Sequence, residues 1–145
     1  MNALTEKYGE NGFMCLGFPS NQFGHQTNDN NDEILNTLKY VRPGNGYEPN
    51  FPMFSKVDIN GANEHPLFAY MKSQVPVPQG DEGATLMSDP KFLIWSPIKR
   101  SDVSWNFEKF LVNADGVPVK RYSRRYPTMD IAKDIEELLP VSVPN

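Results

Sequence analysis

The sequence has little of what several classes of protein require. Its 145 residues contain one cysteine, Cys15, so a small secreted framework of intrachain disulfides is excluded. No apolar run approaches the roughly 20 residues that a membrane-spanning helix needs. No basic segment followed by an apolar one, the pattern of a secretory signal, begins the chain. The formal net charge of −4 is too small to indicate binding to nucleic acid or to membranes.

What the chain does contain is typical of a folded globular domain. Hydrophobic residues make up 39% and aromatic residues 12% of the sequence, which favours a real core over a disordered chain. A chain of 145 residues is long enough for one such core but hardly for two. We therefore expect residues 1–145 to form a single domain. Thirteen prolines and ten glycines indicate many loops.

Hydrophobic periodicity and turn residues predict an α/β fold. Helices are expected over residues 1–8, 32–40, 66–71 and 128–139. Strands are expected over residues 13–18, 53–59, 107–112 and 117–122, with a hairpin turn at 114–116 and a loop over 74–91. We expect Asp32 to cap the second helix, and the continuous apolar run 13–18 to be buried on both faces. This order of elements predicts a mixed sheet with helices on its faces.

Few residues could hold a metal or act as a nucleophile. A metal site requires clustered His, Cys or carboxylate side chains, and Cys15, His25 and His65 do not stand at ligand spacing. We therefore favour ordinary surface or loop histidines. Cys15 lies inside an apolar run, where a thiol is more often buried and inert than reactive.

Two further features have competing interpretations. Residues 120–126, KRYSRRY, form the densest basic cluster, but the acidic remainder of the chain argues against nucleic acid as its ligand. A small anionic ligand and a solvated strand end explain the cluster equally well. Trp105, at the expected start of a strand, is by itself more typical of a core residue than of an indole donor in a cleft.

Two long motifs resemble signatures of the glutathione peroxidase family. Residues 17–26, GFPSNQFGHQ, are similar to its G-F-P-C-N-Q-F-G-x-Q signature, with Ser20 at a position where the signature has Cys. Residues 105–111, WNFEKFL, are similar to its W-N-F-x-K-F-L signature. Shorter matches occur at residues 60–61, 64–68 and 121–125. The motifs stand in the family's order, and the resemblance covers essentially the whole chain.

The resemblance implies both a fold and a reaction. The fold is thioredoxin-like, in agreement with the α/β prediction. The reaction is the reduction of hydrogen peroxide or organic hydroperoxides with glutathione as co-substrate, in response to oxidative stress. In the family, a selenocysteine or cysteine attacks the peroxide, and two glutathione molecules reduce the resulting selenenic or sulfenic acid. No metal or prosthetic cofactor is implied.

The resemblance also assigns roles to single residues. The family's neutral hydrogen-bond donors, which stabilise the attacking anion and lower its pKa, match Gln26, Trp105 and Asn106. This assignment replaces the interpretation of Trp105 as a core residue. Within the first signature, Asn21 and Gln22 are expected to shape the loop that presents Gln26.

Arginines that hold the carboxylates of glutathione in the family match Arg42, Arg124 and Arg125, while Asn30 stands where some members have a lysine. The long regions 38–47 and 74–101 are similar to those of the cytosolic, tetramer-forming branch. The resemblance therefore implies a cytoplasmic homotetramer with neither nucleic acid nor a membrane as partner.

The family's peroxidatic residue lies upstream of the first signature, and residues 1–4 are similar to the middle of the helix that follows it. We therefore expect an N-terminally truncated selenocysteine-type chain, with the selenocysteine upstream of Met1 and the N-terminal strand or strands missing. We expect it to be inactive alone, because Cys15 is far in sequence from the donor loop. One alternative is a catalytically silent thioredoxin-fold binding or assembly subunit. Another is a thioredoxin-dependent cysteine peroxidase, which would usually bring a resolving cysteine.

Overall fold

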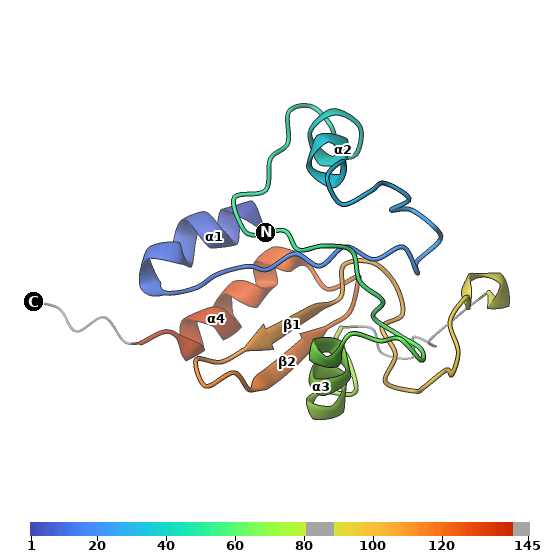
Figure 1. Cartoon of the computed structure of the whole chain (residues 1–145). Coiled ribbons are helices and arrows are strands. Elements are labelled where there is room, and N and C mark those ends of the chain that lie inside the picture. The colour runs from blue at the N-terminus through green and yellow to red at the C-terminus, as the bar shows by residue number, and fades with distance from the viewer. Residues whose placement is uncertain (81–88, 141–145) are drawn as a thin grey trace, which may run out of the picture.

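The structure is a computed structural model that describes residues 1–80 and 89–140 (Figure 1). Its elements, with short 3-10 helices marked η, are α1 (Asn2–Tyr8), η1 (Gly9–Asn11), α2 (Ile34–Tyr40), α3 (Pro66–Gln74), η2 (Pro90–Phe92), β1 (Lys109–Val112), β2 (Pro118–Tyr122), η3 (Thr128–Ile131) and α4 (Ala132–Leu138). Residues 81–88, part of the expected loop 74–91 and of the long region 74–101, lie outside the described residues. Across the described part of the chain, no helix is both long and apolar enough to cross a membrane.

Two of the four predicted helices, α1 and α3, begin where the sequence predicts, whereas the predicted helix 128–139 begins as the 3-10 helix η3 and continues as α4. In α1, Leu4 and Tyr8 stand one turn apart and are both buried, as their spacing predicts. Gly12 closes this helical stretch with φ +96°, a conformation that favours glycine. α3 begins with Pro66 in its first turn, and Nδ1 of His65 accepts a hydrogen bond from the backbone N–H of Leu67 at 3.2 Å.

The start of α2 differs from the prediction. Its N-cap is Glu33, and no side chain caps the helix, so the expectation that Asp32 is the cap is wrong. The Glu33 carboxylate instead accepts the backbone N–H of Asn30 at 2.8 Å, which closes the turn before the helix. Only one side of the short helix is covered: Ile34 is buried, whereas Leu35 is 54% exposed. In Figure 1, α2 stands apart from the sheet.

The predicted hairpin is confirmed. β1 pairs with β2 in antiparallel register, for example Phe110 with Arg121, and the register shifts between Leu111 and Val112. In the turn, Oδ1 of Asn113 accepts the backbone N–H groups of residues 115 and 117, at 3.0 and 2.9 Å. The sheet of the described residues has these two antiparallel strands, and an isolated parallel bridge between Gln79 and Tyr122 forms no third strand.

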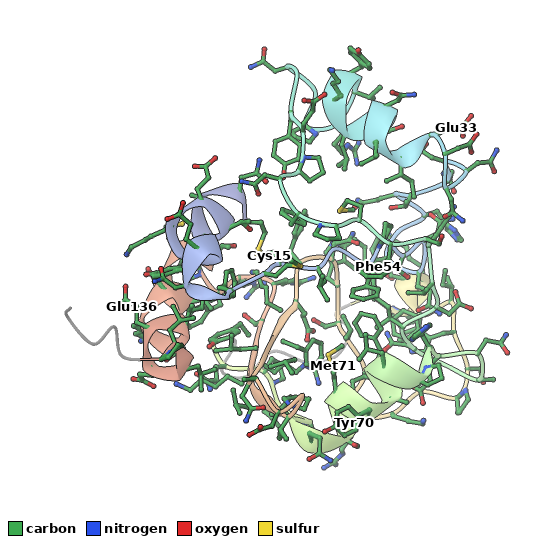
Figure 2. All side chains as sticks on the ribbon, turned by 60° about the vertical axis from the view of Figure 1, so that its left-hand side comes forward. Cys15, Glu33, Phe54, Tyr70, Met71 and Glu136 are labelled. Atoms are coloured by element: carbon green, nitrogen blue, oxygen red, sulfur yellow. The ribbon has the colours of Figure 1, made fainter. Side chains whose placement is uncertain are left out.

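The prediction that residues 13–18 and 53–59 form regular strands is wrong. Residues 13–18 and 53–59 are extended and run side by side, marked by Cys15 and Phe54 in Figure 2, but they share only the parallel bridge between Gly17 and Met53. Prolines at positions 19 and 52 have no N–H with which to extend the ladder. The run is not buried on both faces either: Cys15 is buried, whereas Met14 is 64% and Leu16 is 50% exposed.

Two apolar clusters form the core. The first joins α1 and α4 to the hairpin through Leu4, Tyr8, Leu111, Tyr122, Ile131 and Ile135. The second lies around α3 and the long loops, and consists of Phe23, Ile59, Phe68, Met71, Trp95 and Val103. Because the second cluster contains residues from the loops before and after α3, it brings chain positions 23 and 103 into one packed unit.

The first cluster predicts a contrast between two leucines. Leu4→Ala should lower the free energy of unfolding by about 2–5 kcal/mol, because Leu4 is fully buried and its loss leaves a cavity. Leu35→Ala, the same change at an exposed helix position, should change this free energy by no more than about 0.5 kcal/mol. Urea denaturation followed by circular dichroism measures both values. Equal effects of the two changes would contradict the described packing of α1.

Candidate functional site

The loop over residues 19–26 is shaped by amide side chains. Oδ1 of Asn21 accepts the backbone N–H of Thr27 at 2.9 Å, and its Nδ2 donates to Oδ1 of Asn28 at 2.9 Å. Nδ2 of Asn28 donates in turn to the carbonyl oxygen of His25 at 2.9 Å. These bonds fold the loop back on itself and leave Gln26 at its exposed end.

The structure brings the three predicted donors together. Nδ2 of Asn106 donates to Oε1 of Gln26 at 3.0 Å, although the two residues lie 80 positions apart in the chain. The Trp105 ring packs against this loop, with its centroid 6.2 Å from that of Phe23. A Cβ atom at Gly24 would lie 3.0 Å from Cη2 of Trp105 and 3.6 Å from Cγ of Gln26, so glycine allows the indole to approach the loop.

The backbone beside these donors adopts unusual conformations. His25, directly before Gln26, has φ +51°, and Phe107, directly after Asn106, has φ +67°. Residues other than glycine rarely adopt positive φ, and such positions tend to gather at functional sites. Phe107 is also 77% exposed, which is high for an aromatic side chain.

The donor cluster carries no net charge of its own. Within the described residues, the indole N–H of Trp105 and the amide nitrogen of Gln26 donate no hydrogen bond. Neutral N–H groups can stabilise a nearby anion without transferring a proton to it. The arrangement can therefore hold a small anion or lower the pKa of an acid placed next to it.

The three predicted arginines lie in different places. Arg42 is exposed just beyond the C-terminal end of α2, whereas Arg124 and Arg125 lie in the turn after β2. The backbone N–H of Arg125 donates to Oγ of Ser123 at 3.2 Å. Within the described residues, the side chains of Arg42 and Arg124 make no hydrogen bond or ion pair, either with the donors or with other residues.

Neither earlier interpretation of the basic cluster fits Arg121. This residue is 1% exposed, and its Nε donates to the Glu108 carboxylate at 2.7 Å. Its Nη atoms donate to the carbonyl oxygens of Ser101 and Asp102 at 2.8 and 3.0 Å. Arg121 is therefore a structural cation that holds the loop leading to Trp105, since it has an anionic partner and is shielded from solvent.

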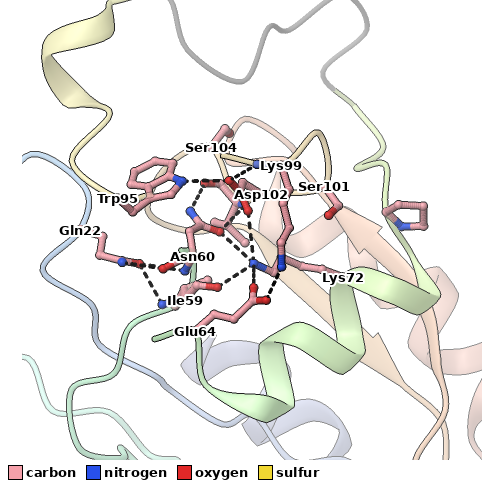
Figure 3. A network of polar contacts seen from close by, with 12 residues as sticks. Gln22, Ile59, Asn60, Glu64, Lys72, Trp95, Lys99, Ser101, Asp102 and Ser104 are labelled. Carbon is pink, nitrogen blue, oxygen red and sulfur yellow. Dashed lines mark hydrogen bonds and ion pairs between the residues drawn. The ribbon is translucent and has the colours of Figure 1, made fainter. Parts of the chain in front are cut away.

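A buried polar network, which the sequence did not predict, surrounds the Lys72 ammonium group (Figure 3). Lys72 is 2% exposed, and its ammonium group donates to the Ile59 carbonyl oxygen at 2.7 Å and to Glu64 at 2.5 Å. It also faces Asp102 at 3.4 Å, whose other carboxylate oxygen accepts the indole N–H of Trp95 at 2.8 Å. In the sequence, Lys72 resembles an ordinary helix-end cation, and no local pattern marks it as buried.

The remaining candidates are separate from the donors. Cys15 is buried, as predicted, and its Sγ lies 3.9 Å from Sδ of Met1. His65 is exposed, and its side chain caps the start of α3. In residues 1–80 and 89–140, no three His, Cys, Asp or Glu side chains gather as a metal site.

A cavity of about 310 Å³ opens beside Trp95, with Gln22 and residues 58, 60–63 and 94–96 in its lining.

Comparison with known proteins gives a consistent result. Residues 1–72 match the sequence profile of the family described as "Glutathione peroxidase". Glutathione peroxidase 1 of Rattus norvegicus is 60% identical over 139 residues, which cover 96% of this chain and 69% of the relative. Glutathione peroxidase 1 of Sus scrofa is also 60% identical over 139 residues, with 67% of its length covered.

Solved structures confirm the predicted thioredoxin-like α/β fold class. The structure described as T. cruzi GPX1 superposes with a TM-score of 0.56 at 28% identity, over 94% of this chain and 67% of that chain. The apo form of Trgpx also superposes with a TM-score of 0.56, over 94% of this chain and 66% of that chain. At 24% identity, this second similarity concerns the fold alone.

The network predicts acid sensitivity through Glu64. Burial raises the pKa of this carboxyl, but hydrogen bonds from Lys72 and Lys99 outweigh burial and hold the pKa below its usual range. The unfolded chain, where the pKa is about 4.3, therefore takes up the proton first. The free energy of unfolding should be largest above about pH 5 and should decrease as the pH falls through the folded-state pKa.

Glu64→Gln should make this pH dependence shallower, because it removes the group that titrates. Urea denaturation at a series of pH values between 7 and 3.5 would measure the slope. Glu10→Gln, at an exposed position that forms no ion pair within the described residues, is the matched control and should keep the wild-type slope. A wild-type slope in Glu64→Gln would contradict the described ion pairs.

Proposed function

This chain belongs to the glutathione peroxidase family, whose members reduce hydroperoxides with glutathione, and we propose that Gln26, Trp105 and Asn106 are the hydrogen-bond donors of its peroxidase site. The hydrogen bond between Asn106 and Gln26, 3.0 Å long, carries the proposal. It joins the two family signatures at their polar residues. The indole of Trp105, which packs on the same loop, supplies a third neutral donor.

These donors suit the first chemical step. A selenolate or thiolate attacks one peroxide oxygen, the O–O bond breaks, and the leaving oxygen takes up a proton to become water or an alcohol. The attacking group must be an anion, and hydrogen bonds to the anion lower its pKa and keep it ionised at neutral pH. Two glutathione molecules then reduce the oxidised residue and leave as a disulfide.

The attacking residue itself is not Cys15 in this proposal. Cys15 is the single cysteine of the 145 residues, and it is buried with its Sγ beside Met1 rather than beside a donor. We infer that a selenocysteine or cysteine outside these 145 residues supplies the anion. A chain that spans 69% of the rat relative leaves room for such a residue elsewhere in the full protein.

Glutathione binding is assigned to Arg42, Arg124 and Arg125. Glutathione has two carboxylates, and guanidinium groups bind carboxylates through paired hydrogen bonds. Arg124 and Arg125 follow shortly after β2, while Arg42 follows shortly after α2. A ligand held by all three would have to bridge these regions, or Arg42 would act from a neighbouring subunit of the expected homotetramer. Tetramer formation and a cytoplasmic location remain predictions of the family branch.

A catalytically silent subunit is the second candidate. The buried position of Cys15 favours it, since the 145 residues then offer no accessible thiol. The donors argue against it, because the contact between Gln26 and Asn106 is exposed and adds little to stability. A protein without chemistry would have little need for this pair, and we therefore prefer the enzyme.

The first test uses the chain as it stands. The purified 145-residue chain should show no appreciable turnover in an assay that couples glutathione oxidation to NADPH consumption, with hydrogen peroxide as substrate. Cys15→Ser should give the same background. Normal turnover that disappears in Cys15→Ser would show that Cys15 is the attacking residue and would refute the proposal.

The second test addresses the donors in a longer form that carries the attacking residue. Gln26→Ala should reduce kcat/KM by about 10²-fold, as loss of one preorganised donor does elsewhere. It should also shift the acidic limb of the pH profile upward, because the anion loses a hydrogen bond and its pKa rises. Gln74→Ala, an exposed amide at the end of α3, is the control. Equal activities of the two variants would remove Gln26 from the site.

A further inference from the structure

Two buried amide side chains connect the loop that ends at Gln26 with the loop that leads to Trp105 and Asn106. We propose that Gln22 and Asn60 act as positioning residues that set the distance between these loops. The inference rests on the proposed role of the donors and adds the groups that place them. Within the described residues, neither positioning residue forms a hydrogen bond with a donor, so each acts through the backbone of its loop.

Gln22 forms the first half of the connection. Its side chain is buried, and its Oε1 accepts the backbone N–H groups of Ile59 and Asn60 at 2.8 and 2.9 Å. Its Nε2 donates to the carbonyl oxygen of Asn60 at 2.9 Å. The amide thus forms the hydrogen bonds to the backbone of residues 59 and 60 that a neighbouring strand would otherwise form. Gln22 stands four positions before Gln26 in the sequence.

Asn60 forms the second half in the same way. It is 1% exposed, and its Nδ2 donates to the carbonyl oxygen of Val103 at 2.8 Å. Its Oδ1 accepts the backbone N–H of Val103 at 2.9 Å, so one side chain satisfies both backbone groups of that residue. Val103 stands two positions before Trp105. Figure 3 shows Gln22, Asn60 and the residues around Lys72 as one connected set.

The connection is rigid for two physical reasons. Each amide is planar and makes hydrogen bonds on both its oxygen and its nitrogen, so its rotation would break several bonds in a dry environment. The Lys72 ammonium also donates to Oδ1 of Asn60 at 3.1 Å, which fixes the orientation of that amide. Buried polar groups that are fully satisfied specify a single arrangement.

The donors cannot fix their own placement. The hydrogen bond from Asn106 to Gln26 is exposed, where water competes for both groups. A single exposed bond between two loop ends is broken easily. The register of the two loops must therefore come from the buried contacts behind them, and the path through Gln22, Asn60 and Val103 joins them directly.

Two isosteric changes test the proposal. Asn60→Asp and Gln22→Glu each replace an N–H₂ donor with an oxygen that faces a carbonyl oxygen, while the shape of the side chain is kept. Asn50→Asp is the matched control, because Nδ2 of Asn50 also joins distant segments, with a 3.1 Å bond to the Asn2 carbonyl oxygen, but far from the loops in sequence. All three are made in the 145-residue chain.

The readout is the nuclear Overhauser effect between the side-chain amide protons of Asn106 and the side chain of Gln26 in the isotopically labelled protein. Both positioning variants should lose this signal while they retain the signals between Leu4 and Ile135 in the first core cluster, and the control should keep both. Persistence of the signal in a folded positioning variant would overturn the proposal. So would its loss in Asn50→Asp.

A wild-type measurement covers the case in which the variants do not fold. At increasing urea concentration, the signal between Asn106 and Gln26 should disappear together with the hydrogen-exchange protection of the backbone N–H groups of residues 59, 60 and 103. Loss of the signal while these groups stay protected would refute the inference. Because none of these readouts needs turnover, an unchanged activity of Gln26→Ala would count against the proposed function alone.

Discussion

The buried ammonium group of Lys72 is the interaction on which the arrangement of the loops depends. It reaches from α3 to the backbone of residue 59, to Asn60, to Glu64 and to Asp102. A charge so far from water is tolerated only where anionic and dipolar partners surround it, and its removal leaves those partners unsatisfied. The segments before and after α3 must therefore lie together around this one side chain.

A second buried cation has a similar effect on the other side of the same loop. The side chains of Arg121 and Glu108 are each 1% exposed, and Glu108 also accepts the backbone N–H of Ser104 at 2.7 Å. The segment leading to Trp105 is thus held from α3 through Lys72 and from β2 through Arg121. Both full charges are neutralised within these buried pairs.

The donors at the surface, in contrast, are all neutral. This separation has a chemical consequence. Charged groups next to an attacking anion could form an ion pair with it. Amide and indole N–H groups instead stabilise the anion while it stays able to attack the peroxide. The buried ion pairs hold the loops, and the exposed neutral donors are left for the chemistry that we propose.

The family and the main local elements were predictable from the sequence. The spacing of Leu4 and Tyr8, Pro66 at a helix start and the turn after Asn113 each carry a local signal, and all three are confirmed. The family followed from two long motifs. Local signals failed where pairing is non-local: residues 13–18 are as apolar as a buried strand, yet Met14 and Leu16 are exposed and the ladder stops at prolines.

The sequence by itself determined which neutral side chains could serve as donors, because the motifs contain them, and which short segments form helices and the hairpin. Only the tertiary structure decided that Gln26 and Asn106 meet, since their hydrogen bond spans 80 positions and no local pattern encodes it. It also decided that Lys72 and Arg121 are buried, although no local pattern marks either cation as buried. Burial depends on which distant segments cover a residue, and that is a property of the packed chain.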